Sequence, residues 1–207
     1  MDYLFSLIFR ASFFSFFLFF IVALPVFLEI DTLLSLWLVE TPEYTDIFIR
    51  ILLIISSIEV LASPLNVSLQ ATGDIKRFEL TIGIILMLTV PVSYIVLKFY
   101  PLPQNAFWVF LFQVCIAHVA RLFLMRYKLG LPISLYLRKV ALKIVPVAIF
   151  SMIIPITLHY SISSGILRLI CVIVACLTFT PCSIFLIGLS KIEQKELVNK
   201  VKQRLFK

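Results

Sequence analysis

The chain has 207 residues, of which 62% are hydrophobic and only 14% are charged, and its mean hydropathy is +1.11. A soluble domain usually carries about 25% charged residues and at most about half apolar residues, so this composition excludes a soluble protein and indicates one embedded in lipid. The formal net charge of +7 does not indicate a nucleic-acid partner, because the basic residues lie mainly between the apolar runs, as in cytoplasmic loops of membrane proteins.

Six apolar segments are long enough to cross a membrane. A spanning helix needs roughly 20 residues, because each residue adds about 1.5 Å across a hydrocarbon core of about 30 Å. The segments are 11–28, 47–67, 80–97, 106–125, 140–159 and 166–189. The predicted fold is therefore all-α, a single polytopic domain over 1–189. The first segment exceeds the apolar core of a typical signal peptide and no small-residue cleavage site follows it, so we expect it to be retained.

Two shorter segments are predicted to lie on the membrane surface. The apolar run 33–38, between the first two spans, is too short to cross and predicts an interfacial helix that Pro42 ends. In the tail, 190–207, Ile192, Leu197, Val201 and Leu205 fall on one stripe of a helix whose other face is rich in lysine. This pattern predicts a basic amphipathic helix bound to anionic membrane lipid; a frayed polar terminus is the alternative.

The connections between the spans alternate in charge. The first is acidic, the third (99–105) and the fifth (160–165) carry no charged residue, and the second, the fourth and the tail are basic. Because Lys and Arg are concentrated in cytoplasmic loops, the basic connections are predicted to lie in the cytoplasm. Both termini are then cytoplasmic, which agrees with an even number of spans.

Glu59 lies near the middle of the second predicted span, where a charged side chain is costly and therefore marks a candidate functional site. Asn66 is one helical repeat further on, so both residues can share a face, and Gln70 follows near the inner end. In one interpretation Glu59 faces an aqueous cavity and contributes to ion coupling or substrate passage. In the other it pairs with a basic residue of a neighbouring helix or stays protonated.

His118 and Arg121 lie on adjacent turns of the fourth span. They are either a basic pair that lines a cavity, or a packed histidine beside an arginine that reaches the inner interface. Arg50 and Arg168 near outer ends, and Arg10 near an inner end, are expected to reach the interface in the same way.

Motifs for catalysis, for cofactor binding and for metal binding are missing from the sequence. There is no paired-carboxylate motif, no glycine-rich phosphate loop and no HExxH, and the four cysteines lie inside apolar runs without metal-ligand spacing. We therefore expect a protein that is not an enzyme and holds no cofactor or metal. Six prolines inside the spans predict helix kinks.

One stretch of the chain contains motifs that indicate a protein family more specifically than the overall composition does. It contains Leu36-Trp37-Leu38, Pro42-Glu43-Tyr44, Gln70-Ala71-Thr72-Gly73 with Lys76, and Pro91 through Tyr94; Asn105-Ala106-Phe107 and Arg121 continue it. To about residue 160, this resembles the C-terminal half of bacterial O-antigen and polysaccharide flippases of the multidrug/oligosaccharidyl-lipid/polysaccharide exporter superfamily.

The resemblance implies one lobe of a two-lobed transporter in the bacterial inner membrane. Its substrate would be an undecaprenyl-pyrophosphate-linked glycan, whose anionic pyrophosphate suits basic residues in a cavity. The chain has about half the length that the family implies, so it is either a truncated product or the partner of a separate N-terminal lobe. Two other interpretations stay open: a non-transporting membrane scaffold, and a membrane-embedded transferase of the same pathway.

Overall fold

The computed structural model describes residues 2–73, 75–189, 191 and 194–195, and the predicted amphipathic tail lies almost wholly outside them. The described part is helical, and no strand occurs in it. Its elements in chain order are α1 (Asp2–Leu28), α2 (Ile30–Trp37), α3 (Thr45–Gln70), α4 (Ile75–Met87), α5 (Thr89–Phe99), α6 (Gln104–Leu129), α7 (Ile133–Tyr136), the π-helix η1 (Leu137–Ala141), α8 (Leu142–Ser161), α9 (Ile166–Ser183) and the π-helix η2 (Ile184–Gly188).

The prediction of six spans is confirmed: among the described residues, six helical segments are long and apolar enough to cross a membrane. They are Tyr3–Leu28, Thr45–Gln70, Ile75–Phe99, Gln104–Leu129, Ile133–Ser161 and Ile166–Gly188. The first begins well before residue 11, because the helix runs through Arg10 without a break from Asp2. The fifth begins before residue 140 for a similar reason, since Arg138 and Lys139 lie within its first turns.

The third span is broken into α4 and α5 at Leu88. Pro91 explains the break: it has no N–H to donate to the carbonyl of Met87, and its ring crowds that carbonyl. The short helix predicted after the first span is also present, as α2, but it ends at Trp37 rather than at Pro42. Leu38 has extended backbone angles (φ −112°, ψ 136°), so the chain has left the helix before the proline.

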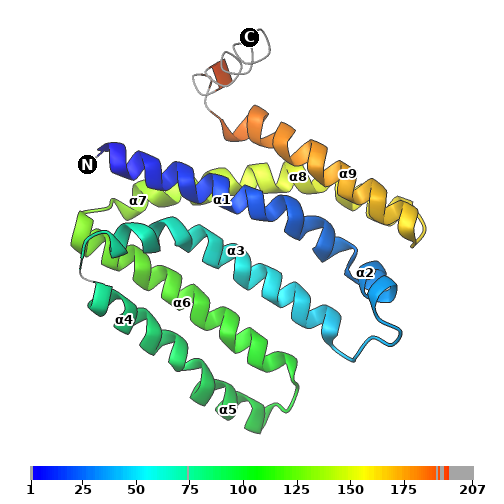
Figure 1. The fold of residues 1–207 in the computed structure, drawn as a ribbon, viewed down its shortest axis with the longest axis horizontal. Helices are drawn as coiled ribbons and strands as arrows, with labels where there is room; N and C mark the ends of the chain where they lie inside the picture. Colours follow the sequence, from blue (N-terminus) through cyan, green and yellow to red (C-terminus); the bar gives the residue numbers. More distant parts are fainter. Residues whose placement is uncertain (1, 74, 190, 192–193, 196–207) are drawn as a thin grey trace.

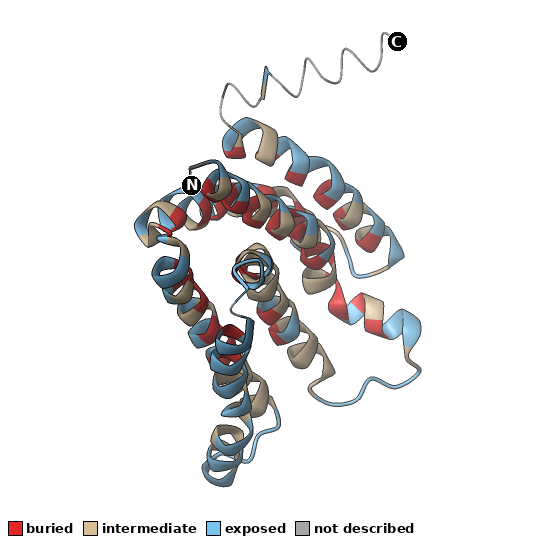
Figure 2. Cartoon of the chain, turned by 60° about the vertical axis from the view of Figure 1, so that its left-hand side comes forward, coloured by how far each residue is buried: buried red, intermediate tan, exposed pale blue. Residues whose placement is uncertain are grey.

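The spans form a layered bundle with α1 and α3 in its middle (Figure 1). α8 and α9 pack together on the α1 side, while α6 packs on α3 and separates it from α4 and α5. α1 supplies most of the core through a run of buried phenylalanines, among them Phe13 and Phe17, whose ring centroids lie 4.9 Å apart. Figure 2 shows the contrast with the lower end of the molecule, where α4 and α5 are mostly exposed.

Candidate functional site

An ion pair joins α3 to α6 within the predicted membrane core. Arg121 donates from its Nη1 to Glu59 Oε1 (3.1 Å) and from its Nη2 to Glu59 Oε2 (3.3 Å), which is a bidentate arrangement. The Arg121 side chain is 4% exposed, whereas the Glu59 side chain is 37% exposed. Of the two interpretations of Arg121, the one in which it reaches the inner interface does not fit this geometry, because its guanidinium is buried and held by the carboxylate.

The sequence of α6 explains why Arg121 faces α3. Gln113, Ala117 and Arg121 are spaced by four residues, so they lie on one helix face, and all three are buried. Ala117 on α6 and Ala62 on α3 are both fully buried. Small residues at such positions let membrane helices approach closely, which brings the Arg121 side chain within reach of Glu59.

Glu59 belongs to a line of polar residues along α3, which we call the α3 polar stripe: Ser56, Glu59, Ser63, Asn66 and Gln70. Spacings of three and four residues place them on one face of the helix. Ser63 and Gln70 are exposed and the others are half-buried, so the described part of the chain covers this face only in part. The prediction that Asn66 shares the face of Glu59 agrees with this arrangement.

Asn66 and Gln70, the two members of the α3 polar stripe nearest the C-terminal end of α3, differ in their hydrogen-bond partners. Gln70 Nε2 donates to Glu79 Oε1 of α4 at 3.1 Å. Asn66 Oδ1, in contrast, is buried and has no hydrogen-bond partner among the described residues. An amide oxygen left unpaired in this way is costly. Because the atom is buried, a polar group from outside the described part of the chain could reach it only if neighbouring side chains moved.

His118 does not join the ion pair. It is half-buried one turn before Arg121, its ring centroid lies 6.4 Å from that of Tyr136, and its Nδ1 has no partner within the described part of the chain. The structure thus brings Glu59 and Arg121 together, places Asn66 and Gln70 on the same helix face as Glu59, and leaves His118 against Tyr136.

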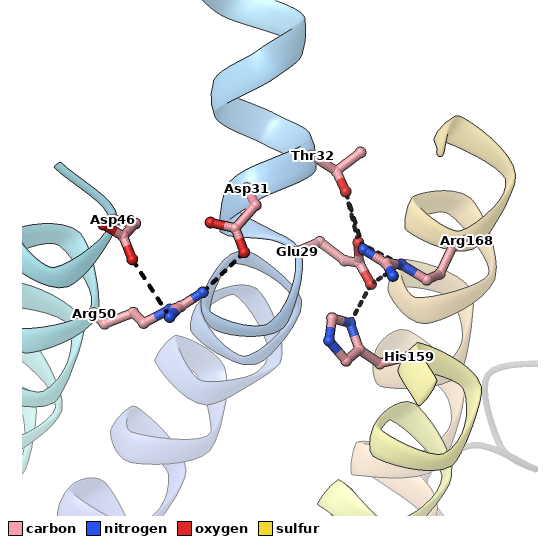
Figure 3. A network of polar contacts seen from close by, with 7 residues as sticks. All are labelled: Glu29, Asp31, Thr32, Asp46, Arg50, His159 and Arg168. Carbon is pink, nitrogen blue, oxygen red and sulfur yellow. Dashed lines mark hydrogen bonds and ion pairs between the residues drawn. The ribbon is translucent and has the colours of Figure 1, made fainter. Parts of the chain in front are cut away.

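A second polar network lies at the C-terminal end of α1 (Figure 3). The sequence analysis did not predict it. Glu29, between α1 and α2, is fully buried. Its Oε1 contacts His159 Nδ1 at 2.7 Å, its Oε2 accepts from Arg168 Nε at 3.0 Å, and Thr32 Oγ1 donates to Oε2 at 3.0 Å. One carboxylate therefore connects the α1–α2 junction to the end of α8 and the start of α9.

The electrostatics of Glu29 favour its charged form. Burial of the carboxylate raises its pKa, but the hydrogen bonds from His159, Arg168 and Thr32 outweigh this effect, so the pKa of Glu29 lies below its ordinary value of 4.5. Glu29 is thus ionised near neutral pH, and its hydrogen bonds make it an anchor between the helix ends.

The other side of α2 is tied to α3. Arg50 Nη2 donates to Asp31 Oδ2 at 3.2 Å, and Arg50 Nη1 lies 3.6 Å from Asp46 Oδ2. The expectation that Arg50 and Arg168 merely reach the interface misses these pairs. The sequence did contain a signal for these pairs. Because successive spans cross the membrane in opposite directions, the end of α1, the start of α3, the end of α8 and the start of α9 must all lie at one membrane surface. The acidic first connection therefore lies beside these arginines.

The α3–α6 site offers side chains that can donate and accept hydrogen bonds. Glu59 keeps an accessible carboxylate edge while Arg121 fixes its position, and the neighbouring hydroxyl and amide groups can both donate and accept hydrogen bonds. Among the described residues, no group of three or more His, Cys, Asp or Glu side chains is placed to hold a metal ion. Comparison with protein-family models, curated proteins and solved structures finds no match to this chain.

Proposed function

We propose that this chain is one lobe of a transporter that flips a lipid-linked oligosaccharide across the bacterial inner membrane. The observation that carries the proposal is the α3 polar stripe, which the described part of the chain leaves partly exposed within a predicted membrane span. Ionisable and polar groups at this depth are expensive against lipid and normally face a protein interior or a water-filled cavity. The resemblance of residues 36–160 to polysaccharide flippases names the class of transporter.

The composition of the stripe suits a glycan. Serine hydroxyls and the Asn66 and Gln70 amides can exchange hydrogen bonds with sugar hydroxyls, and Glu59 can accept them. Arg121 does not suit the role of pyrophosphate ligand that the resemblance suggested for basic residues, because its charge is buried and paired with Glu59. In our proposal the α3 polar stripe contacts the sugar part of the substrate, and other basic groups neutralise the pyrophosphate.

A second lobe is part of the proposal. A transporter that alternates access needs two bodies that move against each other around the substrate, and ligand binding shifts the balance between their two arrangements. The six spans of this chain would form one body, with the α3 polar stripe turned toward the other. A separate N-terminal lobe is therefore the protein partner that we expect.

Complementation tests this function directly. A strain that lacks its polysaccharide flippase is given this chain alone, a candidate N-terminal lobe alone, or both, and surface polysaccharide is measured. We expect restoration only with both lobes. No restoration in any combination, despite confirmed membrane insertion of both chains, would contradict transport and leave a membrane scaffold as the better account.

A further inference from the structure

A group of buried polar side chains lies where α1, α6 and α7 meet, outside the Glu59–Arg121 ion pair. Ser12 of α1 is fully buried and Tyr136 of α7 is 2% exposed, and their side chains are neighbours. His118 of α6 lies beside them, with its ring centroid 6.4 Å from that of Tyr136. The core around this group is otherwise apolar, so its polar atoms need hydrogen-bond partners to offset the cost of burial.

The hydroxyl group of Ser12 is not used by its own helix. A serine inside a helix can donate to the carbonyl oxygen four residues before it. Ser151, which is also fully buried, donates to the carbonyl of Val147 in this way at 2.7 Å. Ser12 Oγ lies beside Tyr136 instead, and it has no partner at hydrogen-bond geometry among the described residues. The buried hydroxyl therefore faces α7 with its capacity for hydrogen bonds unused.

Two other groups beside Ser12 are only partly paired. The Tyr136 hydroxyl donates to the Leu61 carbonyl oxygen of α3 at 3.5 Å, which is long for a hydrogen bond between two oxygen atoms, and its own oxygen can still accept. His118 Nδ1 is buried and has no partner in the described part of the chain. Buried polar groups that the protein leaves over in this way are normally bridged by ordered water.

The charges near this group favour a neutral ligand. Arg121 follows His118 by one turn of α6 and its guanidinium is buried, so a metal cation between these side chains would be repelled. An anion would need a cation that is not already paired, whereas Arg121 is held by both carboxylate oxygens of Glu59. Water is neutral and both donates and accepts hydrogen bonds, so it suits the Ser12 hydroxyl and either tautomer of His118.

We propose that a buried water molecule is bound between Ser12, Tyr136 and His118 and bridges α1, α6 and α7. It forms hydrogen bonds with the Ser12 hydroxyl, the Tyr136 oxygen and His118 Nδ1, and about three such bonds are usual for an internal water. Ordered water is one of the ways in which membrane helices satisfy polar groups that lipid cannot pair. The site thus joins the start of the fifth span to the phenylalanine-rich helix α1. It does not depend on the proposed transport function.

Hydroxyl-radical footprinting of the purified full chain in detergent tests the site. X-rays generate the radicals from water, including bound water, so a buried side chain is oxidised quickly only where water touches it. The oxidation rate of Tyr136 is compared with that of Phe17, which is 1% exposed and packs among other phenylalanines. The test variant is Ser12→Ala and the matched control is Ser151→Ala. Both serines are fully buried helix residues, and the loss of one hydroxyl is small enough for either variant to fold.

We expect Tyr136 of the wild-type chain to be oxidised roughly tenfold faster than Phe17, because only Tyr136 adjoins a bound water. Ser12→Ala should slow the oxidation of Tyr136 roughly threefold, since the water loses one of about three partners. Ser151→Ala should leave the rate unchanged, because that hydroxyl is paired within its own helix. Oxidation of Tyr136 as slow as that of Phe17, or equal rates in the two serine variants, would overturn the proposal.

Discussion

Two carboxylates of this chain have opposite environments. Glu29 is 0% exposed and has three side-chain partners from the α2, α8 and α9 regions. The Glu59 side chain is 37% exposed, and Arg121 is its partner. Glu29 lies at the border of a span, where water is near during folding, whereas Glu59 lies in the interior of one. A charge costs less free energy at the position of Glu29, yet Glu29 is the fully buried carboxylate. It costs more at the position of Glu59, yet the Glu59 side chain is partly exposed.

This difference separates a structural role from a functional one. A fully satisfied, buried carboxylate that connects three parts of the bundle stabilises it, and it leaves no atom for a ligand. A carboxylate whose side chain is held by Arg121 and remains 37% exposed has capacity to bind. We therefore expect that Glu29 matters for stability and Glu59 for transport.

Loss of Glu29 should have the largest effect on stability. Glu29→Ala leaves Arg168 and His159 without their shared carboxylate, and breaking a buried pair typically costs about 3–5 kcal/mol. The free energy of unfolding in a mild detergent measures this loss. Asp31→Asn is the control, because it removes a neighbouring carboxylate whose pair with Arg50 is exposed and should cost at most about 1 kcal/mol. Equal losses in the two variants would refute the role of Glu29 as an anchor.

Glu59→Gln should have a smaller effect on stability than Glu29→Ala and a large effect on transport. The glutamine amide oxygen still accepts a hydrogen bond from Arg121, so we expect a stability loss of about 1–3 kcal/mol. Polysaccharide restored by the two-lobe system should fall at least tenfold at equal protein level. Glu40→Gln, which removes an exposed carboxylate from the first connection, serves as the control and should restore polysaccharide normally. Normal activity of Glu59→Gln would remove this residue from the transport site.

The pH dependence of Glu29 gives the smallest but most specific effect. Because its pKa in the folded protein lies below the ordinary value of 4.5, its stabilisation is complete above about pH 4.5 and is lost as the pH falls through the folded-state pKa. The difference in unfolding temperature between wild type and Glu29→Ala should stay constant from neutral pH to about 4.5 and narrow below it. A difference that widens in acid would contradict the lowered pKa.

Much of the fold could be predicted from the sequence, because hydropathy alone determines which segments can span a membrane. The helix ends could not, since Arg10 and Lys139 interrupt the apolar runs without interrupting the helices. Hydropathy also does not distinguish the core helix α1 from the exposed α4 and α5, because lipid and protein interior are equally apolar.

The candidate site was predictable only in part. Periodicity placed Glu59 and Asn66 on one face, and the pairing of Glu59 with a basic residue was one of two open alternatives. That Arg121 is this partner depends on how α6 packs against α3, which spacing within one helix cannot show. The Glu29 network joins residues more than a hundred positions apart. The alternation of the spans puts their helix ends at one membrane surface, but it does not show which side chains meet there.

The most direct test of the account measures whether the α3 polar stripe faces water. In a variant whose four native cysteines are replaced, Ser63→Cys is compared with Ile84→Cys, an exposed apolar position of α4. Each lies about 10–13 Å from the adjacent inner ends of α3 and α4. A water-soluble maleimide is applied to native membranes. Our account predicts labelling of Ser63→Cys at least tenfold faster than of Ile84→Cys; equal rates at the two positions would contradict it.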